Sequence, residues 1–279
     1  MKSDKKKVIN NGFTYFILIL MSLFVVFPIM WMISTSLKTE QEALLIPPSW
    51  VPHVVSAFGF SYMWKMKPFL LYFINSLLTA GPAAFLSVII GGLSAYSISR
   101  FRFRYRKIFT ISVLFTQMIP GVLIVGPYFK ILNKLSLYNT RLGLALGYIA
   151  VALPFCTWML KGYFDSIPKE LDEAALIDGC NHITALFKII LPLSLPGIVA
   201  TFVFSFLLAW GDLLWALSLT YSESVTTITL GIANSVGEYR VVWPALMAAA
   251  LIASIPSVLL YTILQKYIVG GMTGGSVKG

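Results

Sequence analysis

The sequence predicts an all-α polytopic membrane protein, and three observations carry this prediction. The chain of 279 residues is 58% hydrophobic and only 11% charged, with a mean hydropathy of +0.83, whereas a soluble domain carries about 25% charged residues. Six apolar segments are long enough to cross a bilayer as helices. Basic residues gather in short runs beside these segments, as orientation signals do.

The six expected spans are separated by connections of very different length. We place the spans at residues 13–36, 70–98, 108–132, 142–163, 196–219 and 243–268. A basic N-terminus, 1–12, precedes them, a tail, 269–279, follows, and long connections remain at 38–69, 164–195 and 221–242. With the N-terminus in the cytoplasm, fourteen of the 21 Lys and Arg residues lie on the inner side. This bias predicts that both termini and the connection 164–195 are cytoplasmic, and that 38–69 and 221–242 are outer loops.

Two basic runs need an interpretation. The first, Lys2 to Lys7, resembles the start of a signal peptide, but no small-residue cleavage site follows the apolar run, so we expect a retained first span. The second, Arg100 to Lys107, alternates basic and aromatic residues, and we interpret it as a cytoplasmic anchor rather than a binding patch. The net charge of +10 therefore does not indicate nucleic acid, because the basic residues lie beside apolar spans.

A few polar and small residues stand out within the spans. Asp212 lies in the fifth segment between Trp210 and Trp215. An acid at membrane depth faces a bundle interior or water, and aromatic rings can stack on a sugar, so these three residues are candidates for a substrate path. The alternative is a structural, hydrogen-bonding Asp212 beside core or interfacial tryptophans. Gly143 and Gly147 form a GxxxG motif that predicts close helix packing. Prolines that predict kinks are Pro28, Pro120, Pro127, Pro154 and Pro256.

The connection 164–195 contains an acidic helix in a chain that is otherwise mostly apolar. Pro168 suits the first turn of a helix, and Glu170, Asp172 and Glu173 follow where the helix dipole favours acids. Gly179 can adopt the left-handed conformation that ends a helix. A second helix is expected from residues 181–184 until Pro192 interrupts it. The segment is either an ordinary surface helix or a docking element that offers Glu173 to a basic partner residue.

A motif in this connection resembles the EAA loop of ATP-binding-cassette (ABC) importer permeases. That signature reads Glu-Ala-Ala, three residues, Gly, nine residues, Ile, one residue and Leu-Pro. Every fixed position is matched, by Glu173-Ala174-Ala175, Gly179, Ile189, Leu191 and Pro192. Residues 167–171 and 177–179 resemble the carbohydrate branch, and residues 265–279 are similar to the C-terminus of its second, maltose-type permease subunit. Cys180 and Gly211 depart from the usual family residues, and Gly211 leaves the role of Asp212 open.

The resemblance implies the type I importer permease fold and a multi-pass location in the bacterial inner membrane. It implies a heterodimer with a second permease subunit, two ABC ATPase subunits, and an extracellular or periplasmic sugar-binding protein. Such a chain imports a sugar, here expected to be an oligosaccharide, by alternating access. ATP and Mg are expected on the partner ATPase, and no cofactor on this chain.

The resemblance also assigns roles to residues. The residues implied to couple to the ATPase are Glu173, Ala174, Ala175, Asp178, Gly179, Leu191 and Pro192. The tail would contact the ATPase dimer through Gly274, Gly275 and Lys278, the alternative being a frayed terminus. The loop from about Ser222 to Arg240 is either a segment that probes the binding protein or a plain solvated loop.

Hydrolysis of ATP by this chain is not expected, because it contains no Gly-Lys dipeptide and hence no Walker loop. The alternative function is that of a secondary transporter driven by an ion gradient. Such folds often show repeated halves and intramembrane ion ligands, of which this sequence offers one, Asp212.

Overall fold

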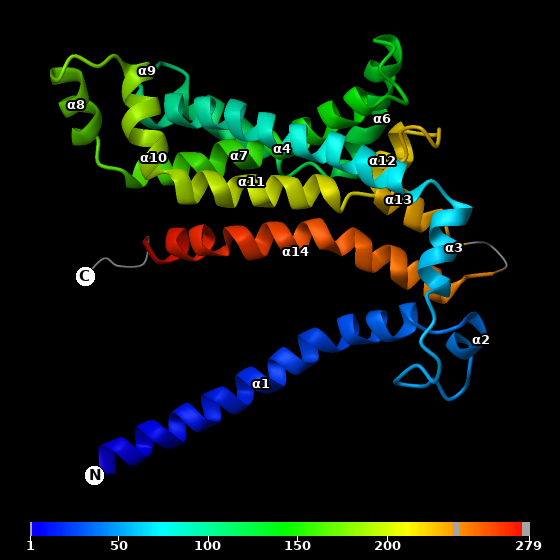
Figure 1. The fold of residues 1–279 in the computed structure, drawn as a ribbon. Helices are drawn as coiled ribbons and strands as arrows, with labels where there is room; N and C mark the ends of the chain where they lie inside the picture. The colour runs from blue at the N-terminus through cyan, green and yellow to red at the C-terminus, as the bar shows by residue number, and fades with distance from the viewer. Residues whose placement is uncertain (1, 237–239, 275–279) are drawn as a thin grey trace. The chain divides into compact units, whose positions relative to one another are not determined.

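The computed structural model describes residues 2–236 and 240–274, and these residues form helices and no strand (Figure 1). In chain order the helices are α1 (Lys2–Ser36), α2 (Glu40–Ala43), α3 (Phe58–Met66), α4 (Phe69–Arg100), α5 (Arg106–Thr116), α6 (Gly121–Lys134), α7 (Arg141–Ser166), α8 (Glu170–Ile177), α9 (His182–Ala185), the π-helix η1 (Leu186–Ile190), α10 (Leu191–Leu193), α11 (Leu195–Trp210), α12 (Leu214–Leu219), α13 (Ile228–Ala233) and α14 (Trp243–Gly274).

Four of these helices, α1, α4, α7 and α14, are long and apolar enough to cross a membrane. The count rises to six if each of two bent helix pairs is one span. Helix α1 begins at Lys2, so the basic N-terminal segment continues into the first span without a break.

The third and fifth expected spans are not single helices. Residues 108–132 fall into α5 and α6, which meet at 100°. The break comprises residues 117–120, and Pro120, which has no N–H, is the N-cap residue of α6. The fifth segment ends as a helix at Trp210, and α11 forms a bent pair, at 78°, with the helical stretch His182–Leu193 that precedes it. Apolar composition continues across both breaks, which is why it does not reveal them.

The chain forms two compact units. One consists of Met1–Phe69 and Ile232–Ser254, and the other of Leu70–Gly231 and Ile255–Gly279. The first unit contains α1, and the second contains α8 and most of the expected spans.

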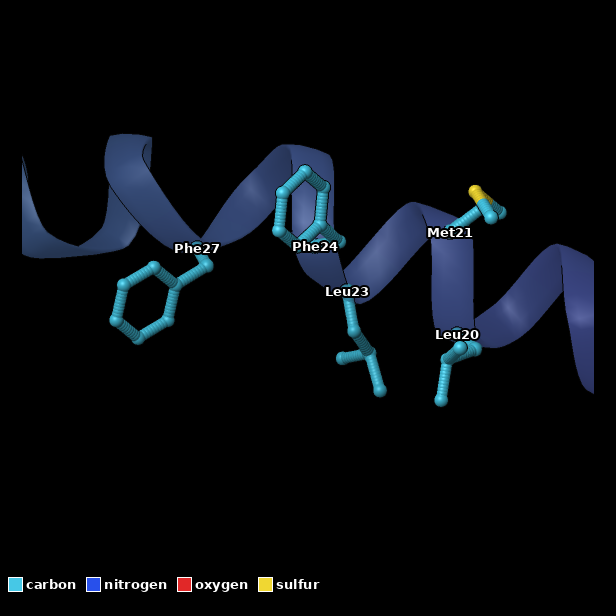
Figure 2. A pocket seen from close by; sticks show the side chains of 5 residues that line it. All are labelled: Leu20, Met21, Leu23, Phe24 and Phe27. Atoms are coloured by element: carbon cyan, nitrogen blue, oxygen red, sulfur yellow. The ribbon is translucent and has the colours of Figure 1, made fainter.

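Helix α1 has an apolar surface that is left uncovered. Figure 2 shows Leu20, Leu23 and Phe27 among the side chains that line a shallow hollow along this one helix. Phe24, which also lines the hollow, is 79% exposed. A stretch of 18 residues within 14–36, the most apolar part of α1, contains no buried residue. Such a surface requires lipid or another helix against it.

The connection between α1 and α3, part of the expected outer loop 38–69, is tightly organised. Glu42 accepts hydrogen bonds from the backbone N–H of His53 at 2.8 Å and from Ser49 Oγ at 3.0 Å. The His53 N–H is the main cause that lowers the pKa of the Glu42 carboxyl. Lys38 is buried over the Trp31 ring, 4.6 Å from its centroid, and donates to the Ser49 carbonyl. This segment is therefore a folded element and not a plain solvated loop.

The second unit is built on α4, α7 and α11. A Cβ at Gly91 of α4 would lie 2.7 Å from Cys156 Cβ of α7, and one at Gly197 of α11 would lie 2.3 Å from Tyr163 Cγ of α7. At one end of these helices a buried apolar cluster joins α4 and α7 to η1. Its members are Ala95, Tyr96, Leu160, Phe164, Leu186 and Ile190. Helices α8 and α9 contact η1, which contributes Leu186 and Ile190 to this cluster.

The GxxxG motif of α7 contacts two different neighbours. A Cβ at Gly147 would lie 2.9 Å from Trp215 Cε3 of α12, so this glycine allows the close packing that the motif predicts. A Cβ at Gly143 would instead lie 2.1 Å from the carbonyl oxygen of Leu137, which belongs to the loop before α7.

Substituting Gly197 with Ala is expected to destabilise the second unit by about 1–3 kcal/mol, because the added methyl group overlaps the Tyr163 ring. The matched control is Gly162→Ala in α7, where a Cβ would meet nothing within 4 Å. That change is expected to stabilise the helix by about 0.5–1 kcal/mol. Thermal unfolding of the purified variants in detergent measures both, and equal melting temperatures would contradict the close approach of α11 to α7.

Candidate functional site

Helix α8 ends in a well-defined turn, as the sequence predicts. Gly179 has a φ of +84°. The N–H of Gly179 donates to the Leu176 carbonyl at 3.1 Å, and the N–H of Cys180 donates to the Ala175 carbonyl at 2.9 Å. These two bonds are those of a Schellman motif, with Asp178 as the C-cap residue. The chain therefore reverses sharply after α8 and leads directly into α9.

One face of α8 is buried and the other is free. Asp172 and Ala175 are buried, whereas Glu173 and Ala174 are exposed. Ile177, at the end of the helix, is 86% exposed, although it is a large apolar residue. An anionic, small and apolar surface on a helix outside the candidate spans is suited to contact with another protein.

The buried face of α8 is attached to α4 by an ionic network. Arg100 Nε lies 2.8 Å from Asp172 Oδ2, and these side chains are only 5% and 10% exposed. This contact is an ion pair without aligned hydrogen-bond geometry. Tyr96 OH donates to Asp172 Oδ1 at 3.0 Å, and Arg100 Nη2 donates to the Ile167 carbonyl at 3.1 Å. The sequence shows Asp172 only as a dipole-compensating acid and Arg100 only as a basic anchor, so this network was missed.

The second helix of the connection starts as predicted but ends differently. Asn181 Oδ1 accepts from the Thr184 N–H at 2.8 Å and caps α9. A π-helical turn, η1, follows, and α10 then carries Leu191 and Pro192. The expectation that Pro192 interrupts the helix is wrong, because the helical stretch continues to Leu193 and the break falls at Ser194. Leu191 packs against the buried cluster, whereas Pro192 is exposed.

The turn at Gly179 supports a sharp prediction. Gly179→Val is expected to cost about 1–2 kcal/mol, because a β-branched residue disfavours the left-handed conformation, and to misdirect α8. Gly179→Asn is the matched control, since Asn tolerates this conformation and a Cβ there meets nothing within 4 Å. Uptake by whole cells should fall for Val and stay near wild type for Asn. Equal uptake by the two variants would contradict a required left-handed turn.

Asp212 has a structural role within the second unit. Its Oδ2 accepts from the N–H groups of Trp215 at 3.0 Å and Ala216 at 3.1 Å, and from Tyr148 OH at 3.2 Å. The carboxylate thereby satisfies the free N–H groups at the start of α12. The three candidate path residues are close along the chain. Trp210 and Trp215 are both buried, and only Asp212 is partly exposed.

The first half of the expected outer loop 221–242 is packed onto α4 and the loop between α6 and α7. Asn75 Nδ2 donates to the carbonyls of Ser224 and Thr226, at 3.1 and 2.9 Å. Asn139 Oδ1 accepts from the N–H groups of Tyr221 and Ser222, at 2.9 and 3.1 Å. Residues 221–231 are therefore a fixed part of the unit, and the solvated-loop alternative is wrong for them.

The predicted contact of the tail falls mostly outside the described residues. Gly274 is the last residue of α14. Gly275 and Lys278 lie outside the residues that the structure describes.

Comparison with known proteins gives one consistent result. The family model of the binding-protein-dependent transport system inner membrane component matches residues 87–274. The sulfoquinovosyl glycerol transport system permease protein SmoH of Agrobacterium fabrum is 36% identical and covers 91% of this chain and 89% of its own length. The trehalose/maltose transport system permease protein MalG of Thermococcus litoralis is also 36% identical and covers 94% of each chain.

A solved structure supports the fold independently. A bacterial ABC transporter involved in the import of the acidic polysaccharide alginate contains a chain that superposes with a TM-score of 0.79. The match covers 96% of this chain and 98% of that one at 22% identity. The expected all-α fold of an ABC importer permease is thereby confirmed. With most of its length matched by the family model and by relatives at 36% identity, the chain belongs to the family of binding-protein-dependent transport system inner membrane components.

Proposed function

We propose that this chain is a permease subunit of an ATP-driven importer that takes up a sugar by alternating access. The observation that carries the proposal is α8, which exposes Glu173, Ala174 and Ile177 while Asp172 attaches its other face to α4. A helix held in this way can receive a force from a partner protein and pass it to a span. Named relatives that transport trehalose and maltose or sulfoquinovosyl glycerol support a carbohydrate substrate.

The partners follow from the same family. A second permease subunit would complete the pore, and the uncovered apolar surface of α1 is available for it or for lipid. Two ATPase subunits would bind ATP and Mg and receive the α8 helices, and an outer sugar-binding protein would deliver the substrate. A solved relative has been crystallised with an alginate pentasaccharide-bound periplasmic protein, which supports this last partner and an oligosaccharide as the substrate.

The topology that we propose has six spans and cytoplasmic termini in the bacterial inner membrane. It counts α5 with α6, and α11 with the helices before it, as one broken span each. The excess of Lys and Arg on the inner side supports this orientation. It places α8 in the cytoplasm, where an ATPase can reach it.

Asp212 is the residue with which a role in the substrate path can be tested. Asp212→Asn keeps an acceptor for the α12 N–H groups, whereas Asp212→Ala loses the cap and is expected to cost about 0.5–2 kcal/mol. If the carboxylate serves only as a cap, Asn restores both stability and uptake. If it also lines the path, Asn restores stability while the apparent KM for the sugar rises. Uptake kinetics together with thermal unfolding separate the two roles.

The experiment that tests the importer itself is purification of the tagged chain from native membranes under gentle conditions, followed by mass spectrometry of its partners. We expect a second permease and an ATPase, and uptake that vanadate inhibits. A chain that purifies without an ATPase and supports uptake that a protonophore abolishes would overturn the proposal in favour of an ion-driven carrier.

A further inference from the structure

Five basic side chains converge on an open hollow formed by the α4–α5 connection, the start of α5 and one residue of α7. The hollow has a volume of about 530 Å³, and its basic lining consists of Arg102, Arg104, Arg106, Lys107 and Lys161. Lys161 is contributed by α7, whereas the other four belong to the α4–α5 junction. We propose that this hollow binds the phosphate headgroup of an anionic phospholipid.

The hollow has a large excess of positive charge. Lys161 forms an ion pair with Asp165, and that carboxylate also accepts from Ser99 Oγ at 2.6 Å. The side chains of Arg102, Arg106 and Lys107 form no hydrogen bond or close ion pair with any residue that the structure describes, although Arg106 interacts electrostatically with Asp165. Because like charges that line one hollow repel one another, an anion bound among them is favourable. Arg and Lys are the usual ligands of a phosphate group.

The position of the hollow favours a lipid over a soluble anion. Helix α5 extends away from the hollow and contains no buried residue. It exposes apolar side chains such as Ile108, Phe109 and Phe115 along its length. Phe103 and Ile111 lie in the wall of the hollow itself. A ligand with a phosphate at one end and acyl chains at the other matches a cationic hollow that continues into an apolar helix surface. The N-terminus of α5, with its positive dipole end, lies at the same place.

The orientation signal read from the sequence does not account for this geometry. A positive-inside bias needs only that basic residues lie on the cytoplasmic side of the membrane. Here Lys161 comes from a separate helix and joins the run from Arg102 to Lys107 around one concave surface. The basic run and Lys161 therefore line a single hollow, which an orientation signal does not require.

The test uses the transporter purified with its partner subunits in mild detergent, and native mass spectrometry with added phosphatidylglycerol or phosphatidylcholine. The variant is Arg106→Gln with Lys107→Gln. The matched control is Lys130→Gln with Lys134→Gln on α6, which removes the same charge from two exposed residues. We expect phosphatidylglycerol to bind the variant roughly 30-fold more weakly than wild type, with the control unchanged and phosphatidylcholine weak throughout.

Two results would overturn the proposal. Equal binding of phosphatidylglycerol by variant and control would show that the hollow does not select the headgroup. Displacement of the lipid by an equal concentration of inorganic phosphate would show that a soluble anion is the preferred ligand. Because all four substituted side chains are at least partly exposed, folding is expected to be unaffected, and elution of the intact complex on size exclusion verifies this.

Discussion

Reversing the charge at Glu173 is expected to abolish sugar uptake, with a loss of roughly 100-fold or more. Removing one partner of a buried, hydrogen-bonded charge pair at an interface costs about 2–5 kcal/mol, and reversal adds repulsion. Glu173 is exposed on α8 and forms no ion pair within the described part of the chain, so the effect would come from the partner and not from the fold. The measurement is the amount of ATPase that co-purifies with Glu173→Lys, together with uptake in cells.

Two further variants make this result specific. Glu173→Gln removes the charge without reversing it and should give an intermediate loss. Lys65→Glu reverses an exposed charge on α3, in the other unit, and should leave ATPase recovery and uptake near wild type. Normal ATPase recovery with Glu173→Lys would exclude this residue from the docking contact.

Removing one partner of the Arg100–Asp172 pair is expected to have the second largest effect. Asp172→Ala leaves Arg100 buried without its carboxylate, and such changes cost about 3–5 kcal/mol. The change also releases α8 from α4, so ATP hydrolysis should continue with little transport per ATP. The measurements are thermal unfolding of the complex and the ratio of sugar imported to ATP consumed.

A double-mutant cycle tests whether the two residues act as a pair. Arg100→Met combined with Asp172→Leu removes both charges and should recover most of the stability that either single change loses. Arg240→Ala is the control, because its ion pair with Glu40 is exposed and is worth about 1 kcal/mol or less. Strictly additive losses at Arg100 and Asp172 would contradict the pairing.

The long apolar helices were predictable because the lipid bilayer sets both the composition and the length of a helix that crosses it. A helix that crosses lipid must be apolar over a fixed length, so the predicted segments 70–98 and 142–163 match α4, Phe69–Arg100, and α7, Arg141–Ser166, within a few residues. The same criterion could not reveal the bend between α5 and α6, because the residues around Pro120 remain apolar on both sides. A proline predicts a kink, but the neighbouring helices decide its angle.

The site was predictable where it is local and not where it is long-range. The turn at Gly179 and the start of the second helix near Asn181 involve residues close in sequence, and both were expected. The partners of Asp172 are Tyr96 and Arg100, which lie more than 70 residues earlier in the chain, and nothing in the sequence links them. For Asp212 the structural alternative describes what its side chain does in this structure, since the α12 N–H groups surround it.

The length of helix α4 connects two segments of the chain that lie far apart. It is one helix of 32 residues, about 48 Å long, and it contacts a functional segment near each end. Near its start, Asn75 and Ser76 hold the segment 221–231, and near its end, Tyr96 and Arg100 hold α8. If both segments move with this helix, their binding equilibria are linked, and linkage is reciprocal. A protein that binds at 221–231 and one that binds at α8 would change each other's affinity by the same factor, and in the proposed topology either change can be measured from the opposite side of the membrane.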